Sequence, residues 1–143
     1  MIELLIDLVA NRIIVAVLLA CLLSQFLKPV VEFFKTQKFN SKLILSSGYM
    51  PSSHTASISA LTASFYILEG VSNAFIISIV LTVVIFIDAI RLRMAVGKNI
   101  QTLKKITKSK NMNELTGHTV PEALAGVILG IVIAATIHLV SPI

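Results

Sequence analysis

The sequence predicts an all-α integral membrane protein, a polytopic helical bundle with about four spans and a short interfacial helix after the first. Hydrophobic residues make up 56% of the 143 residues and charged residues only 13%, whereas soluble domains are nearer one quarter charged. Several apolar runs approach the ~20 residues that a spanning helix needs. The length fits a single domain, which we expect to cover residues 1–143.

The four expected spans cover residues 13–27, 55–68, 73–87 and 123–140. The second run is rich in Ser, Thr and Ala, and the third is the most apolar. The interfacial helix is expected over residues 29–38, with its Val and Phe side chains facing lipid. The first ten residues carry Glu3 and Asp7, whereas a secretory signal starts with positive charge, so this segment is interpreted as part of the mature protein.

The basic residues predict the orientation of the bundle. Four of the twelve Lys and Arg lie within residues 28–42, and seven lie within residues 91–110. Both segments follow odd-numbered spans and therefore share one side of the membrane. The excess of Lys and Arg in cytoplasmic loops makes this the cytoplasmic side of the cell membrane. The last part of the second segment, residues 102–113, is expected to be a polar linker.

Composition also bears on partners and cofactors. Trp is absent and aromatic residues make up only 6%, so nucleic acid is not an expected partner. A lone cysteine, Cys21, excludes an internal disulfide and a Cys-based metal site, and neither a metal nor a cofactor is expected. Gly126 and Gly130 are four residues apart, which allows close helix packing, either within the chain or in a homodimer.

The first polar cluster, SSGYMPSSHT at residues 46–55, runs directly into the second span. Ser52 or Ser53 is a good helix N-cap. A helix N-terminus attracts phosphate because its backbone N–H groups are unpaired and its dipole is positive there. His54 lies in the first turn, where it could donate a proton to a bound group. The alternative is a capped helix with an interfacial histidine.

The second cluster, GHTVPE at residues 117–122, opens the fourth span. His118 and Glu122 are four residues apart and share a helix face, so the carboxylate could orient the imidazole and stabilise its protonated form. Thr119 and Glu122 also have the spacing of a capping box, in which Glu122 bonds to the backbone instead. The two roles are compatible because a carboxylate has two oxygens.

A third group follows the third span. Asp88 is expected near the cytoplasmic end of an apolar helix, with Arg91 or Arg93 as its partner. Guanidinium groups also bind phosphate oxygens well. The alternative is ordinary basic flanking of a span. Taken together, the three clusters suit metal-free phosphoryl transfer, with one histidine as nucleophile and the other as general acid.

The element MPSSHTA at residues 50–56, the element DxxxxRxxxG at 88–97 and the element GHTVPE at 117–122 resemble the divergent branch of the type 2 phosphatidic acid phosphatase superfamily. That superfamily also contains the vanadium haloperoxidases. The resemblance extends from Gln25 through Gly126. It implies a phosphatase that acts on a lipid phosphate or an isoprenyl diphosphate. The distribution of Lys and Arg places its active site on the cytoplasmic side.

The resemblance implies a role for each matching residue. His118 is the nucleophile that forms a phosphohistidine, Glu122 orients it, and His54 is the general acid for the leaving group. The matches to phosphate-binding positions are Lys28, Lys35, Ser52, Ser53 and Arg93, while Asp88 and Gly117 are supporting residues and Arg91 is a further candidate for binding phosphate. Met112 stands where the superfamily usually has arginine, and Lys35 also replaces an arginine.

Two other functions are consistent with the residues. A non-catalytic membrane module would use the basic side to bind anionic lipid headgroups or a partner helix. A small transporter would line a polar path with Asp88, His54 and His118, although the sequence places these groups at helix ends. The residues do not indicate which lipid phosphate would be the substrate.

Overall fold

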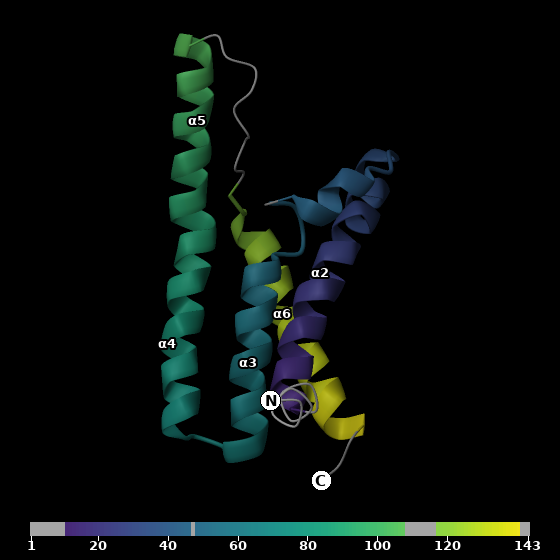
Figure 1. The fold of residues 1–143 in the computed structure, drawn as a ribbon, viewed down its shortest axis with the longest axis vertical. Helices are drawn as coiled ribbons and strands as arrows, with labels where there is room; N and C mark the ends of the chain where they lie inside the picture. The colour runs from purple at the N-terminus through teal and green to yellow at the C-terminus, as the bar shows by residue number, and fades with distance from the viewer. Residues whose placement is uncertain (1–10, 47, 108–116, 141–143) are drawn as a thin grey trace, which may run out of the picture.

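The computed structural model describes residues 11–46, 48–107 and 117–140, apart from the side chains of residues 92 and 93. Every element in these ranges is helical (Figure 1). In chain order they are α2 (Arg12–Thr36), the 3-10 helix η1 (Ser41–Leu45), α3 (Ser53–Glu69), α4 (Asn73–Ile87), the π-helix η2 (Asp88–Leu92), α5 (Arg93–Thr107) and α6 (Val120–Val140).

Three helical segments are long and apolar enough to cross a membrane: α2, α6 and the continuous helix of α4, η2 and α5. The second apolar run, residues 55–68, lies in α3, which has only 17 residues and lies at the centre of the bundle against α2, α4 and α6 (Figure 1). Its small side chains allow this central position, since Ala56 and Ala60 are completely buried. The predicted helical membrane bundle is therefore confirmed.

Helix α2 begins at an asparagine cap and is longer than predicted. The Asn11 side chain accepts a hydrogen bond from the backbone N–H of Ile13 at 2.9 Å. The helix ends where Gln37 adopts a left-handed conformation, and its N–H donates to the Phe33 carbonyl. Pro29 lies inside the helix. The prediction of a separate interfacial helix over residues 29–38 is therefore wrong. Pro29 does not end α2, and the helix continues to Thr36.

The glycines of α6 pack against α3 of the same chain. A Cβ atom added at Gly126 would meet the Thr55 hydroxyl and the Ser52 carbonyl oxygen. A Cβ atom at Gly130 would meet backbone atoms of Ala56 and Ala60. This face is therefore filled within the chain. It does not supply the homodimer surface that the glycine spacing also allowed.

Helix α4 is joined to α3 by hydroxyl groups and then continues beyond the bundle. The hydroxyls of Thr62 and Thr82 lie 2.8 Å apart, within hydrogen-bond distance, which joins two otherwise apolar helices. Through η2, α4 runs on into α5, which projects past the other helices (Figure 1). Because α5 extends to Thr107, the first half of the linker expected over residues 102–113 is helical. The remainder lies outside the described ranges.

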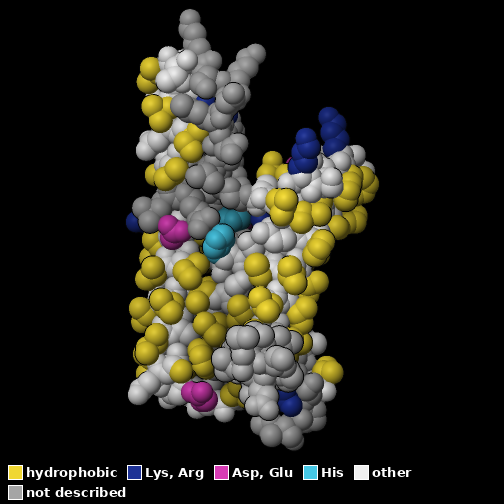
Figure 2. All heavy atoms as spheres, viewed as in Figure 1, with side chains coloured by type: hydrophobic (Ala, Val, Ile, Leu, Met, Phe, Trp, Pro, Cys, Tyr) yellow, Lys and Arg dark blue, Asp and Glu magenta, His cyan; other side chains and the backbone are white. Residues whose placement is uncertain are grey.

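The outer surface of the bundle is suited to lipid. Hydrophobic side chains are spread along the length of the bundle on the face seen in Figure 2, and charged side chains are few there. On α4, Ile77 is 61% exposed and Val80 is 58% exposed. Exposed aliphatic side chains around an entire helix face are expected where the solvent is hydrocarbon instead of water.

Candidate functional site

A small polar cavity lies where α3 and His118 approach the second half of α2. Its volume is about 210 Å³. The residues that line it come from four segments of the chain: Gln25, Lys28, Leu45, Ser46, Gly48, Ser53, His54 and His118. Figure 2 shows histidine side chains (cyan) at the surface of this part of the molecule. The structure thus brings the two histidine clusters, which are far apart in the sequence, to one cavity.

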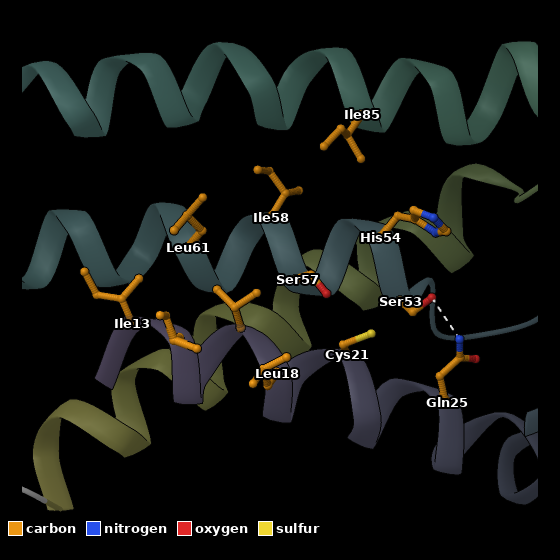
Figure 3. A pocket seen from close by; sticks show the side chains of 12 residues that line it. Ile13, Leu18, Cys21, Gln25, Ser53, His54, Ser57, Ile58, Leu61 and Ile85 are labelled. Atoms are coloured by element: carbon orange, nitrogen blue, oxygen red, sulfur yellow. Dashed lines mark hydrogen bonds between the residues drawn. The ribbon is translucent and has the colours of Figure 1, made fainter. Parts of the chain in front are cut away.

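The start of α3 supplies His54 and Ser53. Ser52 is the N-cap, and its buried hydroxyl accepts from the Thr55 N–H at 3.5 Å. Ser53 is the first helical residue, and its hydroxyl accepts a hydrogen bond from the Gln25 side chain at 3.4 Å (Figure 3). His54 is exposed at the cavity. The N-terminus of α3, the positive end of the helix dipole, therefore adjoins the cavity.

Two hydrogen bonds hold the starts of α3 and α6 together. The backbone N–H of Ser52 donates to the Glu122 carbonyl at 3.2 Å. The Thr55 hydroxyl donates to the Ala123 carbonyl at 2.9 Å. These bonds fix the position of the segment bearing His54 relative to the segment bearing His118.

Glu122 performs the capping role and also lies beside His118. One carboxylate oxygen accepts from the Thr119 N–H at 3.0 Å, which is one of the two bonds of the predicted capping box. The same oxygen, Oε2, is 3.6 Å from Nδ1 of His118, slightly beyond hydrogen-bond distance. His118 is only 2% exposed. The carboxylate therefore faces Nδ1, which leaves Nε2 as the nitrogen available for chemistry.

The π-helix η2 makes a contact that the sequence did not predict. The backbone N–H of His118 donates to the carbonyl of Ala89 at 3.0 Å, and Ala89 is almost completely buried. A π-helical turn widens the helix and is frequent at functional sites. The residues of η2 give no local signal for this turn, because it depends on a partner about thirty residues later in the sequence.

Lys28 provides a buried cation next to the histidines. It is 1% exposed, and its Nζ donates to the Ser46 carbonyl at 2.8 Å. Of the Lys and Arg side chains that the structure describes, Lys28 is the one found in the cavity lining. Gln25 also lines the cavity and was not predicted as a site residue. Its buried Oε1 makes no hydrogen bond to any described group.

Several predicted site residues do not line the cavity. Lys35 is exposed on α2, two helical turns or about 10 Å along the axis from Lys28. Arg91 is exposed in η2 and Asp88 is half-buried there. Gly117 is half-buried beside His118. The side chain of Arg93 and the whole of residue 112, where methionine replaces the usual arginine, lie outside the described residues.

The surroundings of His118 lower its pKa from the ordinary value of 6.5. Burial is the largest cause, since it disfavours the charged imidazolium. The Glu122 carboxylate opposes this by raising the pKa, while the charges of Lys28 and His54 lower it further. The net effect favours neutral imidazole near neutral pH, which is the nucleophilic form.

The described ranges contain no group of three His, Cys, Asp or Glu side chains close enough to hold a metal ion. The cavity instead presents nitrogen donors, hydroxyl groups and a buried ammonium group. This set of groups is suited to binding an oxyanion.

Comparison with known proteins gives one family and one relative. The model of a family described as the Divergent PAP2 family matches residues 9–133. The chain is 26% identical over 148 aligned positions to a protein of Bacillus subtilis (strain 168) named as the uncharacterized membrane protein YuiD, covering 89% of this chain and 94% of that protein. No solved structure matches.

Proposed function

This chain belongs to the Divergent PAP2 family, and we propose that it is a lipid-phosphate hydrolase that acts through a phosphohistidine intermediate. The observation that carries the proposal is the shared cavity. His54 and His118 line it together with the buried ammonium group of Lys28 and the start of α3. This combination provides a nucleophile, a proton donor and binding groups for phosphoryl oxygens.

In the first step, Nε2 of neutral His118 attacks phosphorus. The N–P bond forms as the P–O bond to the lipid alcohol breaks, and protonated His54 gives its proton to the departing oxygen. Glu122 lies beside Nδ1 of His118 and stabilises the positive charge that develops on the imidazole ring. The Lys28 ammonium group and the positive end of the α3 dipole stabilise the phosphoryl oxygens.

In the second step, water replaces the histidine. His54 is now neutral and takes a proton from the attacking water molecule. A new P–O bond forms, the N–P bond breaks, and inorganic phosphate leaves with neutral His118 restored. The reversal of the role of His54, from acid to base, needs no other group in the cavity.

The orientation that we propose places the cavity on the cytoplasmic side. The basic segment that follows α2 and the basic residues of α5 lie at the same end of the bundle as the starts of α3 and α6 (Figure 1). An excess of Lys and Arg favours the cytoplasmic side. A lipid headgroup of that leaflet would then meet the cavity at the ends of the helices.

The phosphohistidine can be detected directly. The purified protein in detergent would be mixed with a radiolabelled lipid phosphate in the presence of a metal chelator, and quenched in base. We expect an acid-labile, base-stable label on the peptide that contains His118. Binding of lipid phosphate without label or phosphate release would instead favour a non-catalytic headgroup-binding module.

The pH dependence of turnover provides a second test. The nucleophile must be neutral, so a lowered His118 pKa places the acidic limb of kcat/KM below pH 6.5. The charge of Lys28 contributes to this lowering. In Lys28→Met the His118 pKa should rise, and the acidic limb should therefore move to higher pH while kcat/KM falls.

Lys35→Met is the matched control for this profile. It removes the same charge from an exposed position on the same helix, where solvent screens its effect. We expect its acidic limb to coincide with that of the wild type. An unmoved limb in Lys28→Met would show that Lys28 does not act on the titrating group.

A further inference from the structure

An apolar groove adjoins the polar cavity and is larger than it. The groove has a volume of about 580 Å³ and lies between α2 and α3. It extends from Gln25 to Ile13 along α2 and from Ser53 to Leu61 along α3, and Ile85 of α4 also lines it (Figure 3). Seven of its twelve lining residues are aliphatic, and three of the polar ones, Gln25, Ser53 and His54, lie at the end next to the cavity. A groove of this kind is suited to a hydrocarbon ligand.

The groove and the cavity share part of their lining. Gln25, Ser53 and His54 line both of them. A second apolar hollow, of about 370 Å³, includes Leu27 and Ile128 but shares no lining residue with the cavity. Of these two hollows, a molecule held in the cavity could therefore extend only into the groove between α2 and α3.

The dimensions of the groove match one hydrocarbon chain. The helix rises about 18 Å over the twelve steps from Ile13 to Gln25 along α2. This is close to one leaflet, or half of the ~30 Å hydrocarbon core of a bilayer. If a methylene group occupies about as much volume as the ~30 Å³ of a water molecule, the groove holds on the order of twenty methylene groups. That is about the volume of one long chain.

We propose that the substrate is a phosphate monoester carrying a single hydrocarbon chain, and that this chain lies in the groove while the phosphate occupies the cavity. The inference rests on the proposed function of the cavity. The shared residues Gln25, Ser53 and His54 would surround the ester bond at the junction. A lipid with two chains would have to leave its second chain outside the groove.

Cys21 provides a measurement that does not depend on turnover. It is the sole cysteine of the chain and lines the groove (Figure 3). The wild-type protein in phosphatidylcholine nanodiscs would be alkylated with N-ethylmaleimide in the presence of alkylphosphonates, whose P–C bond is not hydrolysed. We expect hexadecylphosphonate to slow the labelling of Cys21 severalfold and butylphosphonate to leave it unchanged. Equal labelling rates with the two compounds would overturn the proposal.

A variant that fills the groove tests by kinetics whether the hydrocarbon chain of the substrate lies there. In Cys21→Trp, kcat/KM for hexadecyl phosphate should fall by about tenfold or more while kcat/KM for butyl phosphate stays within about twofold, because only the long chain uses the groove. Leu22→Trp is the matched control, since Leu22 is the next residue on α2 and is 53% exposed toward lipid. Equal losses for both substrates in Cys21→Trp would contradict the proposal.

The two measurements separate failure of the groove from failure of the proposed function. Protection of Cys21 by hexadecylphosphonate without hydrolysis of any phosphate ester would retain the groove and reject the hydrolase. Hydrolysis of butyl and hexadecyl phosphate at equal kcat/KM, without protection of Cys21, would retain the hydrolase and reject the groove. Stronger protection by a diacyl phosphate than by hexadecylphosphonate would reject the single-chain substrate.

Discussion

His118→Ala is expected to lower kcat for hydrolysis of a lipid phosphate by at least about a thousandfold, because it removes the proposed nucleophile. The side chain makes no described hydrogen bond that the fold would lose, since its Nδ1 is 3.6 Å from the Glu122 carboxylate, beyond hydrogen-bond distance, and the bond to Ala89 comes from the backbone N–H. The variant should therefore fold and retain lipid affinity. Phosphate release and lipid binding, measured on the same preparation, test both statements.

His138→Ala is the matched control for this substitution. His138 lies in α6, the helix that begins two residues after His118, and both of its ring nitrogens are buried without hydrogen-bond partners among the described groups. It lies twenty residues from His118, which corresponds to about 30 Å along a helix. We expect His138→Ala to retain turnover. Activity that survived in His118→Ala at the level of His138→Ala would rule out His118 as the nucleophile.

Gly130→Ala is expected to destabilise the folded protein by about 2 kcal/mol or more. The added methyl group would collide with the carbonyl oxygen of Ala56 and the backbone nitrogen of Ala60. Backbone atoms of α3 cannot rotate away as a side chain can, so the two helices must separate. The higher helix propensity of alanine offsets only about 1 kcal/mol of this cost.

The stability of Gly130→Ala can be measured by thermal or denaturant unfolding in detergent. Ile128→Phe is the matched control, because it adds more volume on the same helix at a side chain that is 63% exposed. The control should unfold close to the wild type. A Gly130→Ala variant as stable as Ile128→Phe would mean that α3 and α6 are not packed closely at this position.

Much of the helical architecture could be predicted from the sequence because it depends on local properties. The apolar run at residues 73–87 coincides with α4, and the run at 55–68 lies within α3. Serine caps begin both helices, at Ser72 and Ser52. Apolar length and capping chemistry are sufficient to locate such helices, since neither requires knowledge of the neighbouring elements.

The misassigned elements depended on tertiary context. Pro29 is buried and is accommodated inside α2, whereas the local rule is that proline ends a helix in water. Residues 102–107 were expected to belong to a polar linker, but the helix that begins with α4 extends through η2 and α5 as far as Thr107. The fold of a polar, Lys-rich segment is not determined by hydropathy, so this extension could not be read from the apolar pattern.

The candidate site also contains some residues that local sequence predicts and others that depend on tertiary contacts. The sequence placed His54 and His118 at the starts of two helices on one side of the membrane, and the structure brings both to one cavity. The sequence alone could not identify Gln25 or the Ala89 carbonyl as parts of the site, because a glutamine in an apolar run and a backbone oxygen have no distinctive sequence pattern. The roles proposed for the histidines remain predictions that the experiments above test.

The hydrogen bond from the His118 N–H to the Ala89 carbonyl makes the site sensitive to the number of residues in η2. A π-helical turn contains one residue more than the α-helical turn it replaces. Loss of one residue from Asp88–Leu92 would restore regular α-helical bonding and turn the Ala89 carbonyl back into the helix. Point substitutions in this segment can preserve that carbonyl's direction, whereas a single deletion cannot. The position of His118 in the site therefore depends on the number of residues between α4 and α5.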